Sequence, residues 1–310
     1  MRQKNNNYFG YLFALLATAL WSGNFIVARD LSASFPPIAL AFWRWAVALF
    51  IFTPFALKYV KRDWQRIKKH FRFILITAIF GVTIFNTLIY VAAKTTTAIN
   101  LSLISITFPI FIIIISKFLY YEKITLTKVL GIVLVVLGVV LIFTKGSLDI
   151  LLQLSFFKGD FWMLLAATIF AIYSILLKHK PKKIHLLAFQ YATFFVGLLL
   201  LFPFYLLEFA YSDTVVYNSN TVLSIVYIGI CSSLLAFLLW NKSILLIGPA
   251  KASMIYYTLP LFSGLLAFLI LDEALGFIHL YSAILIVSGI LLSNSKIKTK
   301  VIATNPNRQK

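Results

Sequence analysis

Two stretches of this chain repeat each other at a constant distance of 151 residues. Thr107-Phe108-Pro109 leads through an apolar run to Glu122, and Thr258-Leu259-Pro260 leads through a similar run to Glu273. In both copies the glutamate follows the proline by 13 residues, and a glycine follows the glutamate by 16. If the duplicated unit crosses a membrane an odd number of times, its second copy is inverted, which is a common construction of secondary transporters.

Hydropathy places the chain in a membrane. Apolar residues make up 61% of the 310 residues, charged residues make up 12%, and the mean hydropathy is +0.95. A water-soluble domain of this length needs more polar surface than that. Ten apolar stretches have the length of a membrane-spanning helix, and they cover residues 8–28, 36–58, 73–93, 98–119, 126–144, 159–177, 184–206, 220–241, 250–271 and 276–294.

The basic residues behind the net charge of +19 lie mostly on one side of this predicted topology. With alternating spans, 23 Lys and Arg residues fall on the face of the two termini, four fall on the other face, and Arg44 lies inside a span. Cytoplasmic loops are enriched in Lys and Arg, so both termini are predicted to be cytoplasmic. The basic loops are then expected to contact anionic lipid headgroups, and no nucleic-acid-binding motif accompanies them.

Ten spans and one duplication predict two repeats of five helices. The first and second spans of the two halves correspond at an offset of 149 residues, for example Pro54-Phe55 in the second span with Pro203-Phe204. We expect an all-α integral membrane protein whose parts are a first repeat at 8–144, a periplasmic linker at 145–158, a second repeat at 159–294 and a cytoplasmic tail at 295–310. Because five is odd, the second repeat is predicted to be inverted relative to the first.

Pro109 and Pro260 occupy matched positions near the middle of the fourth and ninth spans. A proline inside a helix removes one backbone hydrogen bond and bends the helix. In hydrocarbon, the freed carbonyl must find a partner or line a wet cavity. Both prolines are therefore interpreted either as packing kinks or as a hinge or cavity wall.

Several of these landmarks resemble the EamA family of the drug/metabolite transporter superfamily. The resemblance covers about residues 8–295, and the residues that carry it are Ala19–Phe25, Phe42-Trp43-Arg44, Tyr90–Lys94 and the paired segments that run from Pro109 to Glu122 and from Pro260 to Glu273. It implies a ten-helix inner-membrane carrier of small metabolites, often an amino-acid exporter, that works by alternating access. It implies no particular substrate, since members carry amino acids, nucleosides, cofactors or sugar-like compounds.

Arg44 is the charged residue that lies well inside a predicted span. Counted from Pro37 at about 1.5 Å per residue, it lies roughly 10 Å below the outer edge. An arginine near the bilayer centre costs about 2.5–3.5 kcal/mol, so it needs a partner or a function. In one interpretation Arg44 snorkels outward, with Trp43 and Trp45 as interfacial anchors. In the other, its guanidinium binds a carboxylate or phosphate of a solute.

Four further side chains are candidates to surround a solute beside Arg44. They are Asn24, Tyr90, Trp240 and Tyr256, and an offset of 150 residues makes Trp240 the predicted counterpart of Tyr90. Amides and hydroxyls form hydrogen bonds with a zwitterion, and aromatic rings stack on a flat group or a cation. The alternative for each of them is a hydrogen bond or packing contact between helices.

The acidic residues do not predict a buried proton-exchange site. Glu122, Glu208, Asp272 and Glu273 fall at span ends, where helix capping or pairing with loop cations is expected. A proton-coupled exporter of cationic drugs generally needs a carboxylate in mid-membrane, so that class is not predicted. Cys231 is the only cysteine, the four histidines are not clustered, and no catalytic or phosphate-loop motif occurs. We therefore expect no metal, no cofactor and no enzymatic activity.

The sequence thus predicts a monomeric transporter of the bacterial inner membrane, whose partners are a small solute and the lipid bilayer. Zwitterionic or anionic solutes are expected, amino acids first, with export by alternating access. A carrier of nucleosides, nucleotides or cofactors is the alternative within transport. An enzyme acting on lipid headgroups would need an interfacial His, Asp or Cys constellation, which the sequence does not contain. A scaffold or receptor subunit is the alternative outside transport, and it would lack a hydrated central cavity.

Overall fold

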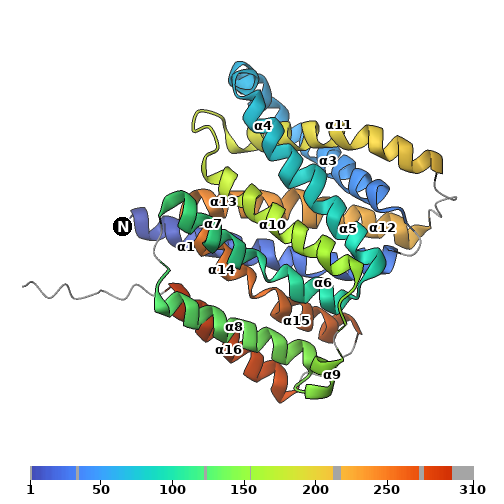
Figure 1. Cartoon of the computed structure of the whole chain (residues 1–310). Helices are drawn as coiled ribbons and strands as arrows, with labels where there is room; N and C mark the ends of the chain where they lie inside the picture. The colour runs from blue at the N-terminus through green and yellow to red at the C-terminus, as the bar shows by residue number, and fades with distance from the viewer. Residues whose placement is uncertain are drawn as a thin grey trace, which may run out of the picture.

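The computed structural model describes residues 2–32, 35–121, 124–153, 155–211, 218–271 and 276–294. Every regular element within these ranges is a helix, as predicted from the hydropathy (Figure 1). The expected helix-end partners Glu122, Asp272 and Glu273 lie outside the described residues, as does the tail at 295–310.

The helices of the first repeat are α1 (Arg2–Ser22), α2 (Asn24–Leu31), α3 (Pro37–Lys69), α4 (Phe71–Ala78), the π-helix η1 (Ile79–Ile84), α5 (Phe85–Thr95), α6 (Ala98–Ser105), α7 (Phe108–Tyr120) and α8 (Leu126–Thr144). A short helix, α9 (Leu148–Leu152), lies in the linker. The helices of the second repeat are α10 (Lys158–Lys178), α11 (Leu186–Tyr211), α12 (Ser219–Tyr227), the π-helix η2 (Ile228–Leu235), α13 (Ala236–Ile247), α14 (Pro249–Tyr256), α15 (Leu259–Leu271) and α16 (Phe277–Asn294).

These helices form ten membrane segments. Within the described residues, nine segments are long and apolar enough to cross a membrane. The remaining predicted span, at 250–271, consists of α14 and α15 placed end to end, and each of them alone is shorter than a bilayer. The predicted fold class, with two inverted repeats of five helices, is confirmed.

Large apolar side chains cover the outside of the helix bundle. Phe50 on α3 is 79% exposed and Leu291 on α16 is 67% exposed, and Phe55, Phe204 and Leu137 are exposed in the same way. Contiguous apolar surface of this kind would aggregate in water, whereas lipid tails solvate it. The outer surface therefore matches a bilayer, as the composition predicted.

The repeats interlock through pairs of equivalent helices. In Figure 1 the repeat-equivalent helices α8 and α16 lie side by side, and α3 packs along its own equivalent α11. Gly131 on α8 faces Gly289 on α16 so closely that a Cβ on either glycine would lie 2.5 Å from the other's carbonyl oxygen. Small residues let membrane helices approach to this distance, which explains Gly289 in the second copy of the sequence repeat; Gly138 in the first copy faces the Ser282 carbonyl oxygen, 2.9 Å from where its Cβ would lie.

The π-helices account for a change in the repeat offset. η1 begins at residue 79 and η2 at residue 228, which is an offset of 149, but η2 is eight residues long and η1 is six. The helices that follow, α5 and α13, therefore correspond at an offset of 151. This extra length makes Asn241 the counterpart of Tyr90 and corrects the predicted pairing of Tyr90 with Trp240.

Pro109 and Pro260 lie at helix starts rather than inside continuous helices. The fourth span breaks at Ile106-Thr107 and the ninth at Tyr257-Thr258, so that each proline occupies the second residue of a new helix. A proline in the first turn removes no intrahelical hydrogen bond. The predicted mid-span bends are thus breaks in the helix, at equivalent positions of the two repeats.

Carboxylates fasten the α3·α11 pair at both ends. Glu208 on α11 accepts hydrogen bonds from the backbone N–H of Ile38 at 3.2 Å and of Ala39 at 2.7 Å, at the start of α3. Asp63 on α3 accepts one from the backbone N–H of His185 at 2.7 Å, just before α11. Negative charge is favourable at helix N-termini. We call the hydrogen bonds of Glu208 to Ile38 and Ala39 the Glu208 clasp, and that of Asp63 to His185 the Asp63 clasp. The two helices are antiparallel, so the two clasps lie on opposite faces of the membrane, in agreement with the predicted alternation of loops.

Candidate functional site

Arg44 is buried at the centre of a polar cluster. Its side chain is 1% exposed. Nε donates a hydrogen bond to Ser233 Oγ at 2.6 Å, and Nη1 donates to the Tyr90 hydroxyl at 2.5 Å and to Asn24 Oδ1 at 3.3 Å. Trp45, the expected interfacial anchor, is fully buried as well. The snorkelling interpretation of Arg44 is therefore wrong, because the guanidinium points into the protein rather than toward the interface.

The irregular helix η2 supplies the partner of Arg44 that the sequence had not indicated. Ser233 accepts the hydrogen bond from Arg44 and donates one to the carbonyl oxygen of Ile228, five residues earlier. The adjacent Ser232 carbonyl accepts a hydrogen bond from Trp21 Nε1 at 2.8 Å. π-Helical turns are frequent at functional sites because they redirect side chains and backbone groups. Here one such turn connects the second repeat to the charged residue of the first.

No carboxylate neutralises Arg44 within the described part of the chain. The ion pairs there join Arg62 and Arg66 to Asp63, near the membrane surface. The hydrogen bonds of Arg44 to described residues use Nε and Nη1, which leaves the donors of Nη2 for another acceptor. A buried charge without a counter-ion is costly. This arrangement leaves a cationic group prepared for an anion.

A small cavity lies beside this cluster, between the two repeats. Its volume is about 20 Å³, and its lining includes the polar residues Asn24, Arg44 and Asn86. Trp21, Phe85 and Phe170 also line the cavity and form its aromatic wall. This volume holds about one water molecule. The site is narrow in this structure, and its lining combines a charged polar cluster with an aromatic wall.

Equivalent residues of the two repeats meet at the aromatic wall. Trp21 and Phe170 correspond at the offset of 149, and their rings contact edge to face with centroids 5.5 Å apart. Phe85 stacks on Phe170 with centroids 4.3 Å apart. Contact between repeat-equivalent residues places this wall on the pseudo-twofold axis that relates the repeats. Inverted-repeat transporters bind their solutes at such an interface.

The structure brings most of the predicted site residues together. Asn24, Arg44 and Tyr90 form one hydrogen-bonded cluster, and Tyr256 lines the cavity. Trp240 does not line it: its indole N–H donates to Ser174 Oγ at 3.2 Å, and its ring packs behind Trp21 with centroids 5.3 Å apart. Trp240 therefore contacts the aromatic wall through Trp21 and does not itself line the cavity.

The two prolines lie near the cavity without lining it. Pro109 and Pro260 are both buried at the helix breaks. Phe108, which precedes Pro109, packs edge to face against Tyr256 with centroids 4.5 Å apart. The breaks thus position aromatic side chains of the wall, while the proline rings themselves stand outside the lining residues of the cavity.

A second buried polar cluster lies in the second repeat. The Tyr173 hydroxyl donates a hydrogen bond to Asn241 Oδ1 at 2.9 Å, and Asn241 Nδ2 donates to Gln190 Oε1 at 2.8 Å. Gln190 is fully buried, and its Nε2 has no hydrogen-bond partner among the described residues. These three residues carry no charge, in contrast to the cluster around Arg44.

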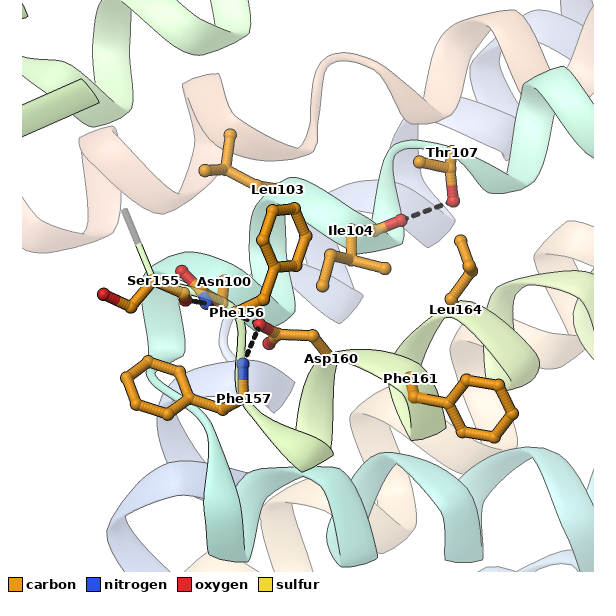
Figure 2. A pocket seen from close by; sticks show the side chains of 10 residues that line it. All are labelled: Asn100, Leu103, Ile104, Thr107, Ser155, Phe156, Phe157, Asp160, Phe161 and Leu164. Atoms are coloured by element: carbon orange, nitrogen blue, oxygen red, sulfur yellow. Dashed lines mark hydrogen bonds between the residues drawn. The ribbon is translucent and has the colours of Figure 1, made fainter. Parts of the chain in front are cut away.

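A groove of about 570 Å³ on the outer surface has a different character (Figure 2). Asp160 lies at its edge, where the carboxylate accepts hydrogen bonds from Thr96 Oγ1, from Asn100 Nδ2 at 2.9 Å and from the Phe157 backbone N–H at 2.8 Å. These bonds tie the start of α10 to the first repeat and use the acceptors of the carboxylate. Apolar side chains such as the exposed Phe161 form most of the remaining lining, to which Thr107 and Ser155 also contribute. We assign this groove to the lipid-facing surface.

Comparison with known proteins agrees with this architecture. The model of the EamA-like transporter family matches residues 8–144 and again residues 157–295. The chain belongs to the EamA-like transporter family. It is therefore a multi-pass membrane transporter of this type.

Similar proteins come from archaea and bacteria. An uncharacterized transporter of Archaeoglobus fulgidus is 28% identical over 296 residues, which cover 92% of this chain and 97% of the relative. The uncharacterized transporter YyaM of Bacillus subtilis is 25% identical, with coverage of 92% and 93%. A crystal structure superimposes with a TM-score of 0.73 at 18% identity, covering 92% of this chain and 96% of the other, and it supports the fold alone.

Proposed function

We propose that this chain exports small solutes that carry a carboxylate, amino acids first among them, by alternating access. The observation that carries the proposal is the buried guanidinium of Arg44. It lies on the wall of a cavity between the two repeats, and no carboxylate of the described residues pairs with it. The two N–H donors of Nη2, which the described residues leave unused, can donate charge-assisted hydrogen bonds to a carboxylate, and such bonds are about twice as strong as neutral ones.

The remainder of the cavity favours a solute with a further cationic or apolar part. Trp21 and Phe170 line the same cavity as Arg44 and pack against each other. Such rings attract an ammonium group and also bury apolar surface. A zwitterionic amino acid satisfies both ends of the cavity, with its carboxylate at Arg44 and its ammonium or side chain at the rings. Asn24 and Tyr90 would then hold the guanidinium in position through their hydrogen bonds.

The small size of the cavity supports alternating access. A space of about 20 Å³ is too small for any organic solute. Helices must therefore move before a solute enters from one face and again before it leaves at the other. We propose that the breaks before Pro109 and Pro260 act as the hinges, since a break lacks hydrogen bonds that would resist bending.

Charge and duplication supply the remaining parts of the proposal. The excess of Lys and Arg on one face supports cytoplasmic termini in a bacterial inner membrane. One chain contains both repeats and closes the cavity by itself, which supports a monomer. The proposed units remain a repeat at 8–144, a linker at 145–158, a second repeat at 159–294 and a tail at 295–310.

The test is counterflow of labelled amino acids in proteoliposomes, with wild type, Arg44→Ala and Thr193→Ala compared. Thr193 occupies the position equivalent to Arg44 in the second repeat and is also buried, so it is a matched control. Loss of a buried charge contact of about 3 kcal/mol predicts a roughly 100-fold fall in exchange for Arg44→Ala. Thr193→Ala is expected to exchange at nearly the wild-type rate.

Other outcomes would change the proposal in defined ways. Equal exchange by wild type and Arg44→Ala would remove Arg44 from the solute site. Absence of exchange by the wild-type protein would exclude amino acids and direct the assay to nucleosides, nucleotides and cofactors. A guanidinium binds the phosphate of a nucleotide as well as a carboxylate, so the same pair of variants serves for those solutes.

A further inference from the structure

One hydrogen bond occurs at the same place in both repeats. In the first repeat Tyr90 donates to Asn24 Oδ1 at 3.4 Å, and in the second Tyr173 donates to Asn241 Oδ1 at 2.9 Å. Asn24 and Tyr173 correspond at the offset of 149, and Tyr90 and Asn241 correspond at the offset of 151 that follows the π-helices. The tyrosine and the asparagine have exchanged helices, but the bond still joins the first and third spans of the repeat.

In each repeat a third polar side chain forms a hydrogen bond with the asparagine of this pair, and its identity differs between the repeats. In the first repeat it is the guanidinium of Arg44 on α3, and in the second it is the amide of Gln190 on the equivalent helix α11. Gln190 Oε1 accepts a hydrogen bond from Asn241, whereas its Nε2 has none from the described residues although the side chain is 0% exposed. An unpaired buried amide N–H costs about 1–3 kcal/mol. A group that serves only to join helices would be expected to use this donor.

The two clusters lie toward opposite faces of the membrane. Arg44 follows the start of α3 by seven residues and Gln190 follows the start of α11 by four, and these helices are antiparallel. At about 1.5 Å per residue, each cluster lies roughly 6–10 Å inside its own face. Aromatic rings separate them: Phe170 of the cavity wall stacks on the ring of Tyr173 with centroids 5.7 Å apart.

We propose that Gln190, Asn241 and Tyr173 form a second solute station, on the side of the aromatic wall opposite to Arg44. It rests on the proposed function, because its ligand is the carboxylate of the same solute. Gln190 Nε2 supplies a neutral donor to a carboxylate oxygen when the protein is open toward the face that carries Asp63 and His185. A neutral donor binds a carboxylate more weakly than a guanidinium does. The solute is therefore held loosely at this station and tightly at Arg44.

Cysteine labelling tests the station without knowledge of the solute. In a Cys231→Ser background, Gln190→Cys is exposed to a negatively charged, membrane-impermeant methanethiosulfonate applied from either face of sealed vesicles. Modification is expected only from the face of Asp63 and His185. Ala188→Cys, buried on the same helix, is the control and is expected to stay unmodified. An unreactive Gln190→Cys would overturn the proposal, and so would equal modification of both variants.

The KM for transport by the Gln190→Glu variant distinguishes a solute-binding station from a path that admits only water and the labelling reagent. Glutamate keeps the shape and the acceptor for Asn241 but replaces the free N–H donors with an oxygen. Loss of a hydrogen bond to a charged group, together with repulsion between the new carboxylate and that of the solute, predicts a KM at least about tenfold higher for amino acids entering from the Gln190 face. An unchanged KM would overturn the station even if the cysteine is labelled. If wild type moves no amino acid, only the substrate class fails, and the labelling result still decides whether the station is accessible.

Discussion

The buried cluster around Arg44 and the buried cluster around Gln190 occupy matched positions in the two repeats and differ in charge. Both contain a tyrosine hydrogen-bonded to an asparagine across the first and third spans. The first adds a guanidinium and borders the cavity between the repeats, whereas the second adds a neutral amide. The two repeats thus share the geometry of this hydrogen bond, but only the cluster of the first repeat contains a charged side chain.

This difference gives the symmetric framework a direction. Inverted repeats alone would present the same site to both faces of the membrane. A charge in one repeat makes affinity for an anion higher at one end of the path than at the other, since a charged hydrogen bond is about twice as strong as a neutral one. The framework and the site are therefore expected to respond differently to equivalent substitutions in the two halves.

The largest effect on stability is expected from alanine substitution of the glycines at which two membrane helices pack closely. Gly138 and Gly289 are repeat-equivalent, and a Cβ at Gly289 would lie 2.5 Å from the backbone oxygen of Gly131. At Gly138 the nearest atoms are 2.9 Å away and include the Ser282 carbonyl oxygen. Overpacking predicts a loss of about 1–3 kcal/mol for alanine at either position, with Gly289→Ala the more severe.

Thermal unfolding in detergent measures this prediction, with Gly264→Ala as the control. Gly264 is also in a membrane helix, and its nearest neighbour would be 3.7 Å from a new Cβ. Gly138→Ala and Gly289→Ala are expected to lower the melting temperature, and Gly264→Ala to leave it unchanged. If only one of the two repeat-equivalent glycines were sensitive, the framework would be as asymmetric as the site, and the comparison would fail.

A smaller effect, on transport, is expected from the two tyrosines. Tyr90→Phe removes the hydroxyl that accepts from Arg44 Nη1 at 2.5 Å, while Tyr173→Phe removes the equivalent hydroxyl beside the neutral amides. Loss of a hydrogen bond to a charged group predicts about a tenfold lower kcat/KM for Tyr90→Phe. Tyr173→Phe is expected to lower it only two- to threefold, about 0.5 kcal/mol. Equal effects in the same counterflow assay would show that the charge gives the first cluster no advantage.

The smallest effect is expected from pH at one of the two clasps. His185 stacks on Tyr59 with ring centroids 4.1 Å apart beside Asp63. Burial lowers the pKa of the His185 side chain below its usual range, and the positive charge of Arg62 lowers it further. The folded protein therefore favours neutral His185, and this contribution to stability is present above about pH 6.5 and is lost as the pH falls through the lowered pKa.

Melting temperatures between pH 7.5 and pH 5, for wild type and His185→Gln, measure this contribution. His185→Gln is expected to show a shallower decline, by a degree or two, since the side chain is partly exposed. The Glu208 clasp at the other end of α3·α11 contains no histidine and is expected to contribute none of the difference. Identical pH profiles would remove His185 from the account of this clasp.

Much of the framework was predictable because it follows from long apolar segments. Hydropathy gave the ten segments, and the spacing of Pro109, Pro260 and the glycines gave the duplication. The breaks at Ile106-Thr107 and Tyr257-Thr258 were not predicted as breaks, because a proline near mid-span is compatible with a bent continuous helix as well.

The site was predicted less completely for a physical reason. Arg44 was identifiable because a charge inside a span is costly. Ser233, by contrast, lies in a run of small residues and reaches Arg44 only because η2 is a π-helix. The different lengths of η1 and η2 also displaced the predicted counterpart of Tyr90 from Asn241 to Trp240. Hydropathy does not distinguish a π-helical turn from an α-helical one, so neither result was visible in the sequence.

One comparison tests most directly whether Arg44 binds the solute carboxylate. Wild type and Arg44→Gln are each assayed for exchange of an amino acid and of its carboxamide. Each solute that wild type accepts is compared with its amide, which lacks the negative charge. The account predicts that wild type prefers the acid by about 100-fold in kcat/KM and that Arg44→Gln loses this preference, because the two changes remove the same interaction. If Arg44→Gln keeps the preference of wild type for the acid, the carboxylate binds elsewhere and the account is contradicted.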